Sequence, residues 1–328
     1  MVSLEERNFF PSLERNVTPT PSGSQVVSYS SDLGDGGPIV VLIHGYPQSA
    51  FIWRHIVPIL QPKFSLFIPE LPGYGISSHP TVSKDYSKRA IGGAILDALY
   101  SAWPTIQEVD YRRAVILAGH DRGARISHRL AVDRDYYDAE RGLNIVATIL
   151  LDIVPTKVQW DLFGQSPSIA TGYFHWPLLA NVELATHMIL SMGGGNWAKL
   201  ALRLAGTNEK AKARIEEHGA VDVYAGLFNK AETIRGSCED YKAAAGVDYD
   251  QQVEDMKAGR KIDVPTLVMY SAMGIGSKSD VPGAWKEWVA EGTVLEAVAV
   301  EDGYGHYLPE EAYDIVSEKM LELLAKYV

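Results

Sequence analysis

Short runs of β-branched and apolar residues alternate with helical patterns along the first half of the chain, and this alternation limits the fold more than any other feature. Runs such as VVLI and ATILLD are apolar throughout, which is typical of parallel strands buried on both faces. Parallel strands need crossover connections, which the intervening helical patterns supply. The sequence therefore predicts an α/β domain built on a mostly parallel sheet.

The expected elements can be placed by residue range. Strands are expected at residues 25–29, 39–43, 65–68, 114–118, 145–151, 266–270 and 294–300, after a first strand that the pattern does not place. Helices are expected at residues 50–60, 86–101, 122–132, near 282–290 and at 309–327.

The pattern changes after Pro155. Up to about Gly246 the sequence is helical in periodicity, rich in Ala, Leu, Trp and Tyr, and interrupted at Gly193–Gly195, with no expected strand. A helical block after the sixth strand predicts a cap inserted into the sheet domain. The expected division is a core domain of residues 1–154 and 247–328 and a helical cap of residues 155–246.

Composition narrows the class of partner. The net charge of −11 argues against nucleic acid or an anionic membrane, since both require a basic surface. A small anionic substrate remains compatible, because two buried arginines can outweigh a distant acidic surface. Residues 1–16 lack the apolar run of a signal peptide, and other apolar stretches are too short to span a membrane. We expect a cytoplasmic protein whose partner is a small molecule.

One cysteine, Cys238, excludes an internal disulfide and a cysteine-based metal cluster. Its expected role is packing. No metal and no organic cofactor is expected.

The main chemical signal is Gly119-His120-Asp121-Arg122-Gly123, directly after the strand AVILA and before a helical pattern. This is the setting of the nucleophile elbow of α/β-hydrolases, whose serine form is G-x-S-x-G. Glycines at both ends suit the tight turn, which lifts its central residue to the edge of the sheet. Here that residue is Asp121, which we take as the candidate nucleophile. G-x-D-x-G alone is a weak motif, since an acidic helix cap produces the same pattern.

Two further segments fit the same fold. His44-Gly45-Tyr46-Pro47 follows the strand IVVLI, where this fold provides one backbone N–H of the oxyanion hole. The second N–H follows the nucleophile, so the amides of Tyr46 and Arg122 are the expected donors.

A general base is expected after the last strand, where Gly305-His306 precedes the terminal helix. His306 has the strand end, the loop and the chain order that the fold requires. Its acid partner has two candidates. Asp152 ends the sixth strand, and Asp280 lies late in the loop after the seventh; the position of Asp152 favours it.

Taken together, these motifs resemble the fluoroacetate (haloacetate) dehalogenase family, within the α/β-hydrolase group that includes haloalkane dehalogenases and epoxide hydrolases. The resemblance covers most of the chain. HGYP and LPGYG mark only the superfamily, whereas DRGAR, the pair His175-Trp176 and the segment CEDYKAAA are more specific. It implies an α/β-hydrolase fold, with a mostly parallel eight-stranded sheet, helices on both faces and an inserted helical cap.

The resemblance also implies roles for individual residues. Asp121 is similar to the family's nucleophile, His306 to its base and Asp152 to its acid. Arg122 and Arg125 match the pair that holds the substrate carboxylate, and one helical face carries both. The halide pocket corresponds to His175, Trp176 and Tyr241.

The chain departs from the family in two places: the insert DRDYYDAERGLN before the sixth strand, and GGGNWAKL in the cap. Both bear on substrate size more than on the chemistry.

The implied reaction is hydrolysis of a small 2-halo carboxylic acid. The aspartate displaces the halide to form an alkyl-enzyme ester, and a water activated by His306 hydrolyses the ester. An epoxide hydrolase uses the same Asp and His, although its cap typically presents two tyrosines and needs no arginine pair. Two further candidates are an ester or lactone hydrolase and a non-catalytic ligand-binding member of the fold. The sequence leaves open the substrate, the halogen, the stereochemistry and whether the chain forms a homodimer.

Overall fold

The computed structural model describes residues 3–4, 6–82, 85–103, 112–202 and 205–327. An eight-stranded sheet has the order β1-β2-β4-β3-β5-β6-β7-β8. Its strands are β1 (Glu14–Pro19), β2 (Gln25–Ser31), β3 (Ile39–Ile43), β4 (Ser65–Pro69), β5 (Arg113–His120), β6 (Leu143–Leu151), β7 (Thr266–Ser271) and β8 (Leu295–Val300). β2 is antiparallel to β1 and β4, and the strands from β4 to β8 run parallel. The mostly parallel sheet is confirmed, and β1 is the strand that the sequence did not place.

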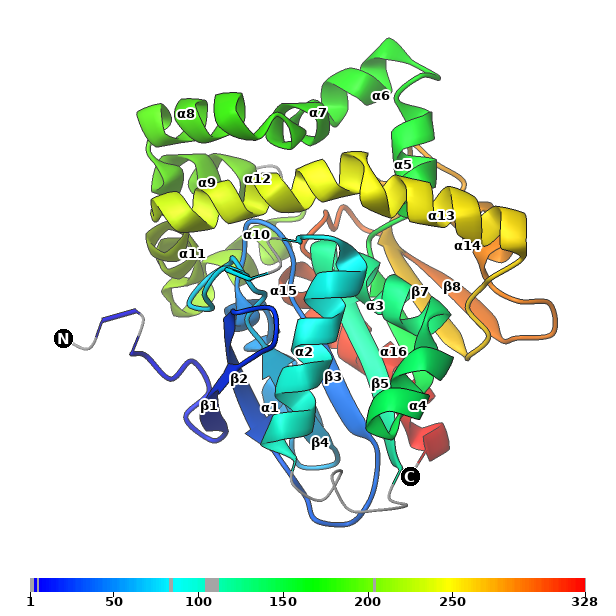
Figure 1. Ribbon diagram of the computed structural model, residues 1–328. Coiled ribbons are helices and arrows are strands. Elements are labelled where there is room, and N and C mark those ends of the chain that lie inside the picture. The colour runs from blue at the N-terminus through cyan, green and yellow to red at the C-terminus, as the bar shows by residue number, and fades with distance from the viewer. Residues whose placement is uncertain (1–2, 5, 83–84, 104–111, 203–204, 328) are drawn as a thin grey trace.

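Helices cover both faces of the sheet (Figure 1). Alternate residues of β3 show why its sequence is apolar throughout: Val40 and Leu42 pack in one hydrophobic cluster and Val41 and Ile43 in the other. One face is covered by α2 (Lys88–Ala102) and α3 (Arg122–Val132), and the other by α1 (Val57–Leu60) and α16 (Tyr313–Leu324). The remaining elements of this part are η1 (Ala50–Trp53), α4 (Arg134–Arg141), α14 (Val281–Trp288), α15 (Leu308–Glu311) and η4 (Ala325–Tyr327).

Between β6 and β7 the described residues form helices and no strand. These helices lie over one end of the sheet, at the top of Figure 1. They are α5 (Thr156–Leu162), α6 (Pro167–Gly172), α7 (His175–Ala180), α8 (Val182–Met192), α9 (Gly194–Leu202), α10 (Glu209–Glu216), η3 (Glu217–Gly219), α11 (Ala220–Phe228), α12 (Ala231–Ala245) and α13 (Val247–Ala258). The division into a core and a cap of residues 155–246 stays a prediction.

Four elements differ from expectation. The helix expected at residues 309–327 is divided into α15, α16 and η4. The helix expected at residues 50–60 is two short ones, and Pro58 lies at the start of the second. The insert before β6 contains α4. The sequence did not predict α13, because the residues that it buries are Asp248, Gln252 and Asp255 instead of an apolar stripe.

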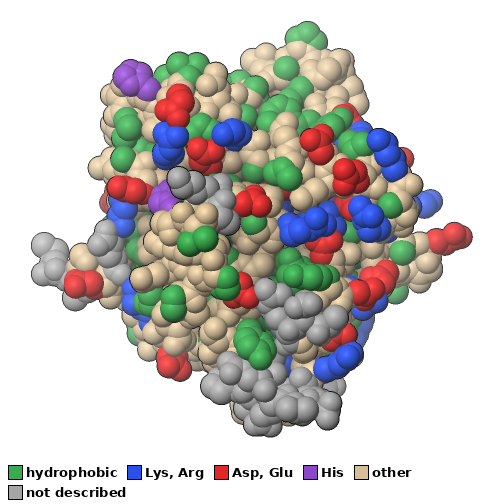
Figure 2. All heavy atoms as spheres, in the orientation of Figure 1, with side chains coloured by type: hydrophobic (Ala, Val, Ile, Leu, Met, Phe, Trp, Pro, Cys, Tyr) green, Lys and Arg blue, Asp and Glu red, His purple; other side chains and the backbone are tan. Residues whose placement is uncertain are grey.

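Buried polar partners hold α13 in place. The Asp248 carboxylate accepts a hydrogen bond from the backbone N–H of Lys88 at 2.8 Å, and Asp255 forms an ion pair with Arg129 of α3. On the face drawn in Figure 2, acidic and basic side chains are interspersed. Within the described part of the chain, no helix has the length and apolar character to cross a membrane.

The turn between β5 and α3 is closely packed against the end of β3. Asp121 has φ 48°, in the left-handed region that non-glycine residues rarely adopt. A Cβ at Gly123 would lie 2.2 Å from the carbonyl oxygen of Ile43 and 2.5 Å from that of His44. Both are backbone atoms, so a side chain at residue 123 requires β3 and α3 to separate.

We therefore expect Gly123→Ala to lower the free energy of unfolding by about 1–3 kcal/mol, the usual cost of overpacking. Gly93→Ala is the matched control. It lies inside α2, where an added Cβ would meet only the Tyr137 hydroxyl at 3.9 Å. Alanine there is expected to raise the free energy of unfolding by up to about 1 kcal/mol through helix propensity. Denaturant unfolding of both variants measures the change in the free energy of unfolding. Equal changes in the two variants would contradict the close backbone approach at Gly123.

Candidate active site

The Asp121 carboxylate lies at the carboxyl end of β5, facing the turn after β3. The backbone N–H of Tyr46 donates a hydrogen bond to Asp121 Oδ2 at 2.9 Å. A Cβ at Gly45 would lie 2.6 Å from the Asp121 Cβ, so only glycine lets the two turns meet. The Tyr46 amide, one of the two expected oxyanion donors, thus forms a hydrogen bond with the Asp121 carboxylate. The role of the Arg122 amide stays a prediction.

Asp121 is 6% exposed, yet its surroundings favour the charged form. Burial alone would raise its pKa, but the positive charges of His306, Arg122 and Arg125 outweigh burial, and the pKa is lowered. Asp121 is therefore ionised at neutral pH, the form that the predicted nucleophile requires.

His306 follows β8 and contacts the end of β6. Its Nδ1 donates to Asp152 Oδ2 at 2.6 Å, and Asp152 Oδ1 accepts the backbone N–H of Ser271 at 2.7 Å. Asp280 instead caps α14, where its Oδ1 accepts the N–H of Gly283 at 3.0 Å. The structure thus brings Asp152, and not Asp280, against the imidazole.

This contact fixes the orientation and the titration of the ring. With Nδ1 bonded to Asp152, Nε2 is left to accept a proton. Removal from water would lower the pKa of His306, but the hydrogen bond from the ring to Asp152 and the charges of Asp152 and Asp121 outweigh that effect, and the pKa is raised.

Glu311 holds the loop that carries His306. Its two carboxylate oxygens accept the backbone N–H groups of Gly305 at 2.6 Å and Tyr307 at 2.8 Å, on either side of the histidine. A third N–H, from Gly206 between α9 and α10, donates to the same carboxylate at 3.0 Å. The His306 loop is therefore positioned by one buried carboxylate that also contacts the segment between α9 and α10.

The Arg122 guanidinium is buried and forms an ion pair with Asp240. Its Nε donates to Asp240 Oδ2 at 2.6 Å, and the Tyr74 hydroxyl donates to the same oxygen at 2.9 Å. Lys88 pairs with the other oxygen of Asp240. Arg122 Nη1 has no hydrogen-bond partner among the described residues, so it is the nitrogen left for a ligand.

Arg125 is buried with neutral partners. Its Nη1 donates to the carbonyl of Val154 at 2.9 Å and to the Thr156 hydroxyl at 3.2 Å. The described residues place no carboxylate within ion-pair distance of it. Burial and the neighbouring charge of Arg122 lower the pKa of Arg125 to about 10, so the group stays charged at neutral pH. A buried cation without a counter-ion favours an anionic ligand.

Three aromatic side chains from α7 and α12 meet above these groups. The Tyr241 ring lies edge-on to Trp176 at 5.5 Å and to His175 at 6.1 Å between centroids. The guanidinium of Arg122 lies 4.2 Å from the Tyr241 centroid, and that of Arg125 lies 4.5 Å from the Trp176 centroid. Burial lowers the pKa of His175 to about 4, so its ring is neutral at pH 7. The structure thus brings the predicted leaving-group residues together with both arginines.

The glycine-rich segment of the cap also contacts this region. Trp197 of α9 donates its indole N–H to the hydroxyl of Tyr46. A Cβ at Gly194 would lie 2.3 Å from the carbonyl oxygen of Phe228, so glycine lets α9 approach α11 closely. The departure from the family at residues 193–200 therefore bears on the Tyr46 side of the site.

Sequence reasoning missed two positioning residues, Asp240 and Glu311. Asp240 directly precedes Tyr241, and Glu311 follows His306 by five residues. An acidic residue close in the chain to a predicted site residue was the available signal.

We expect Asp152→Asn to lower the pKa of His306, because it removes the carboxylate charge that favours the imidazolium. NMR titration of the ring measures this directly. Asp280→Asn is the matched control and should leave the titration of His306 unchanged. The reverse pattern would make Asp280 the partner of the histidine.

Comparison with known proteins places this arrangement in a family. The model of the α/β hydrolase family matches residues 40–319. The fluoroacetate dehalogenase of a Burkholderia sp is 25% identical over 252 residues, which are 76% of each chain. The soluble epoxide hydrolase of Corynebacterium sp. (strain C12) is 27% identical over 296 residues, 89% of this chain and 91% of the relative.

A solved structure gives the same result for the fold. A protein of Nostoc sp PCC 7120 assigned to the α/β hydrolases superposes with a TM-score of 0.80 at 30% identity, over 97% of this chain and 99% of that one. The chain therefore belongs to the α/β hydrolase family of enzymes and is related to dehalogenases and epoxide hydrolases.

Proposed function

We propose that this enzyme hydrolyses a small 2-halo carboxylic acid such as fluoroacetate, with Asp121 as the nucleophile. The observation that carries the proposal is Arg125, a buried cation with neutral partners, beside an aspartate–histidine pair. A substrate carboxylate would supply its missing counter-ion. The relationship to a fluoroacetate dehalogenase supports the same function.

The proposed first step is displacement at carbon. Asp121 Oδ2 is held by the Tyr46 amide, so Oδ1 forms the new C–O bond as the carbon–halogen bond breaks and the halide leaves with the bonding electrons. Arg122 Nη1 and Arg125 hold the substrate carboxylate. His175, Trp176 and Tyr241 offer N–H and O–H donors to the leaving halide, and fluoride, a poor leaving group, needs them most.

The proposed second step is hydrolysis of the resulting ester. His306 Nε2 takes a proton from water as the water oxygen attacks the Asp121 carboxyl carbon. The oxyanion develops on the oxygen bonded to the Tyr46 amide. When the ester bond breaks, the His306 imidazolium gives its proton to the departing hydroxyl oxygen of the hydroxy acid. Asp121 keeps the oxygen from water, and the proton still on that oxygen passes to solvent, which restores the carboxylate. Asp152 keeps Nδ1 protonated throughout and stabilises the imidazolium.

An epoxide hydrolase is the second candidate, and one observation favours it. Tyr173 joins Tyr241 near the site, since its ring centroid lies 6.2 Å from that of His175. Two cap tyrosines suit an epoxide oxygen. An epoxide, however, has no charge to pair with Arg125, so the dehalogenase is the better-supported proposal.

The direct test compares fluoride release from fluoroacetate with diol formation from styrene oxide, for the wild type and for Asp121→Ala. We expect fluoride release by the wild type and none by the variant. Diol formation without fluoride release would reassign the enzyme as an epoxide hydrolase. Turnover by the Asp121→Ala variant at the wild-type rate would contradict the proposal that Asp121 is the nucleophile.

We expect Arg125→Ala to lower kcat/KM for fluoroacetate by about 10- to 100-fold, the effect of losing a charged hydrogen bond. Most of the loss should appear as a higher KM, because the carboxylate is bound in both the ground state and the transition state. The neutral analogue fluoroacetamide should be turned over no more slowly by the variant than by the wild type. Arg89→Ala, which removes an exposed guanidinium paired with Asp133, is the control. Equal losses on acid and amide would show that Arg125 is structural.

A further inference from the structure

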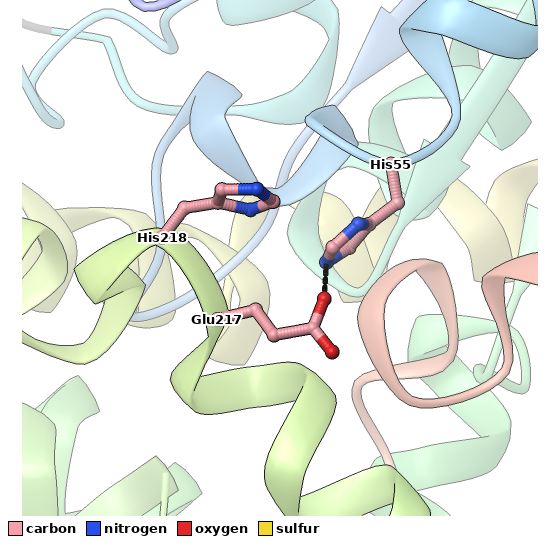
Figure 3. Close-up of side chains that lie close together, drawn as sticks. All are labelled: His55, Glu217 and His218. Carbon is pink, nitrogen blue, oxygen red and sulfur yellow. Dashed lines mark ion pairs between the residues drawn. The ribbon is translucent and has the colours of Figure 1, made fainter.

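Away from the candidate active site, three metal-ligating side chains come together from two distant parts of the chain. They are His55, between η1 and α1, and Glu217 and His218 of η3. One ligand atom of each lies within 4.8 Å of the others. Figure 3 shows His55 and Glu217 pointing toward each other, with the His218 ring beside them.

The His55 ring is fixed with its Nε2 toward the carboxylate. Its side chain is 8% exposed, and the ring stacks on Tyr313 at 4.6 Å and 16°. Nε2 is buried without a hydrogen-bond partner among the described residues, and it lies 3.7 Å from Glu217 Oε2, beyond hydrogen-bond distance. An unpaired ring nitrogen and a carboxylate oxygen therefore face each other at 3.7 Å.

Nearby positive charges do not fill this gap. Arg54 pairs with Glu310, and Arg214 makes two hydrogen bonds of 2.8 and 2.6 Å to Asp314. Each guanidinium thus has its own carboxylate, and among the described residues neither forms an ion pair with Glu217.

The backbone brings His218 to the same point. It adopts φ 60° and ψ 17°, and its ring centroid lies 5.4 Å from that of His55. Its side chain is exposed, as is that of Glu217, so both have room to close around an ion. Two histidines and one carboxylate form a known ligand set for zinc, with a fourth position left for water.

We propose that His55, Glu217 and His218 bind a divalent transition-metal ion of the zinc type. Nε2 of His55, already turned toward the carboxylate on a ring that stacks against Tyr313, is the preformed ligand. The ion joins the chain after η1 to η3, between α10 and α11, and so fastens the helices above the sheet to the sheet domain. This inference does not depend on the proposed function, because none of its ligands belongs to the Asp121 site.

The test is a titration of untagged, chelator-treated protein with zinc chloride, followed by calorimetry and thermal unfolding. We expect one zinc per chain and a Tm that rises until that ratio is reached. His218→Ala and Glu217→Gln change exposed side chains and should fold normally, yet lower the affinity at least about 10-fold and remove the rise in Tm. His187→Ala, an exposed histidine of α8, is the matched control and should behave as the wild type.

Three results would overturn the proposal. The first is no saturable zinc binding. The second is binding that His218→Ala and Glu217→Gln leave unchanged, which would identify an adventitious ion only. The third is an equal loss of binding in the His187→Ala control. Fluoride release with or without zinc is measured separately, and its outcome bears only on the proposed function.

Discussion

The balance of buried charge around Asp121 is the constraint on which the site depends. Two guanidiniums and an imidazole surround the Asp121 carboxylate, the proposed nucleophile, and this positive charge keeps it ionised despite burial. Asp240 forms an ion pair with Arg122, whereas Arg125 has no carboxylate within ion-pair distance among the described residues. A buried charge is costly unless it is paired, and in the proposed function the substrate carboxylate is the partner of Arg125. An epoxide has no charge to offer in its place.

Acidic side chains also tie the helices above the sheet to the catalytic elements. Asp240 of α12 contacts Lys88 and Arg122 below it, and Glu311 joins the His306 loop to Gly206. Each carboxylate accepts hydrogen bonds from several donors. These bonds offset the cost of burying the charge and fix the position of the side chain. The positions of Arg122 and of the His306 loop are thereby linked to how these helices pack on the sheet.

The sequence predicted the parts that rest on local chemistry. Apolar runs marked the strands, and the elbow glycines around Asp121 placed the turn, since close backbone approach leaves no other choice of residue. It did not predict α13 or the positioning role of Asp240, because buried polar residues without an apolar period resemble an exposed segment. It also left both Asp152 and Asp280 as candidates for the acid; only the folded chain brings β6 and the His306 loop together.

The central claim is that an aspartate, and not water, attacks the substrate carbon. A single turnover of fluoroacetate in heavy-oxygen water, with enzyme in excess, tests it most directly. The ester oxygen kept by the product comes from Asp121, so the account predicts unlabelled glycolate and heavy oxygen in the peptide that contains Asp121, read by mass spectrometry. Label in the glycolate with none in that peptide would mean direct attack by water and would contradict the account.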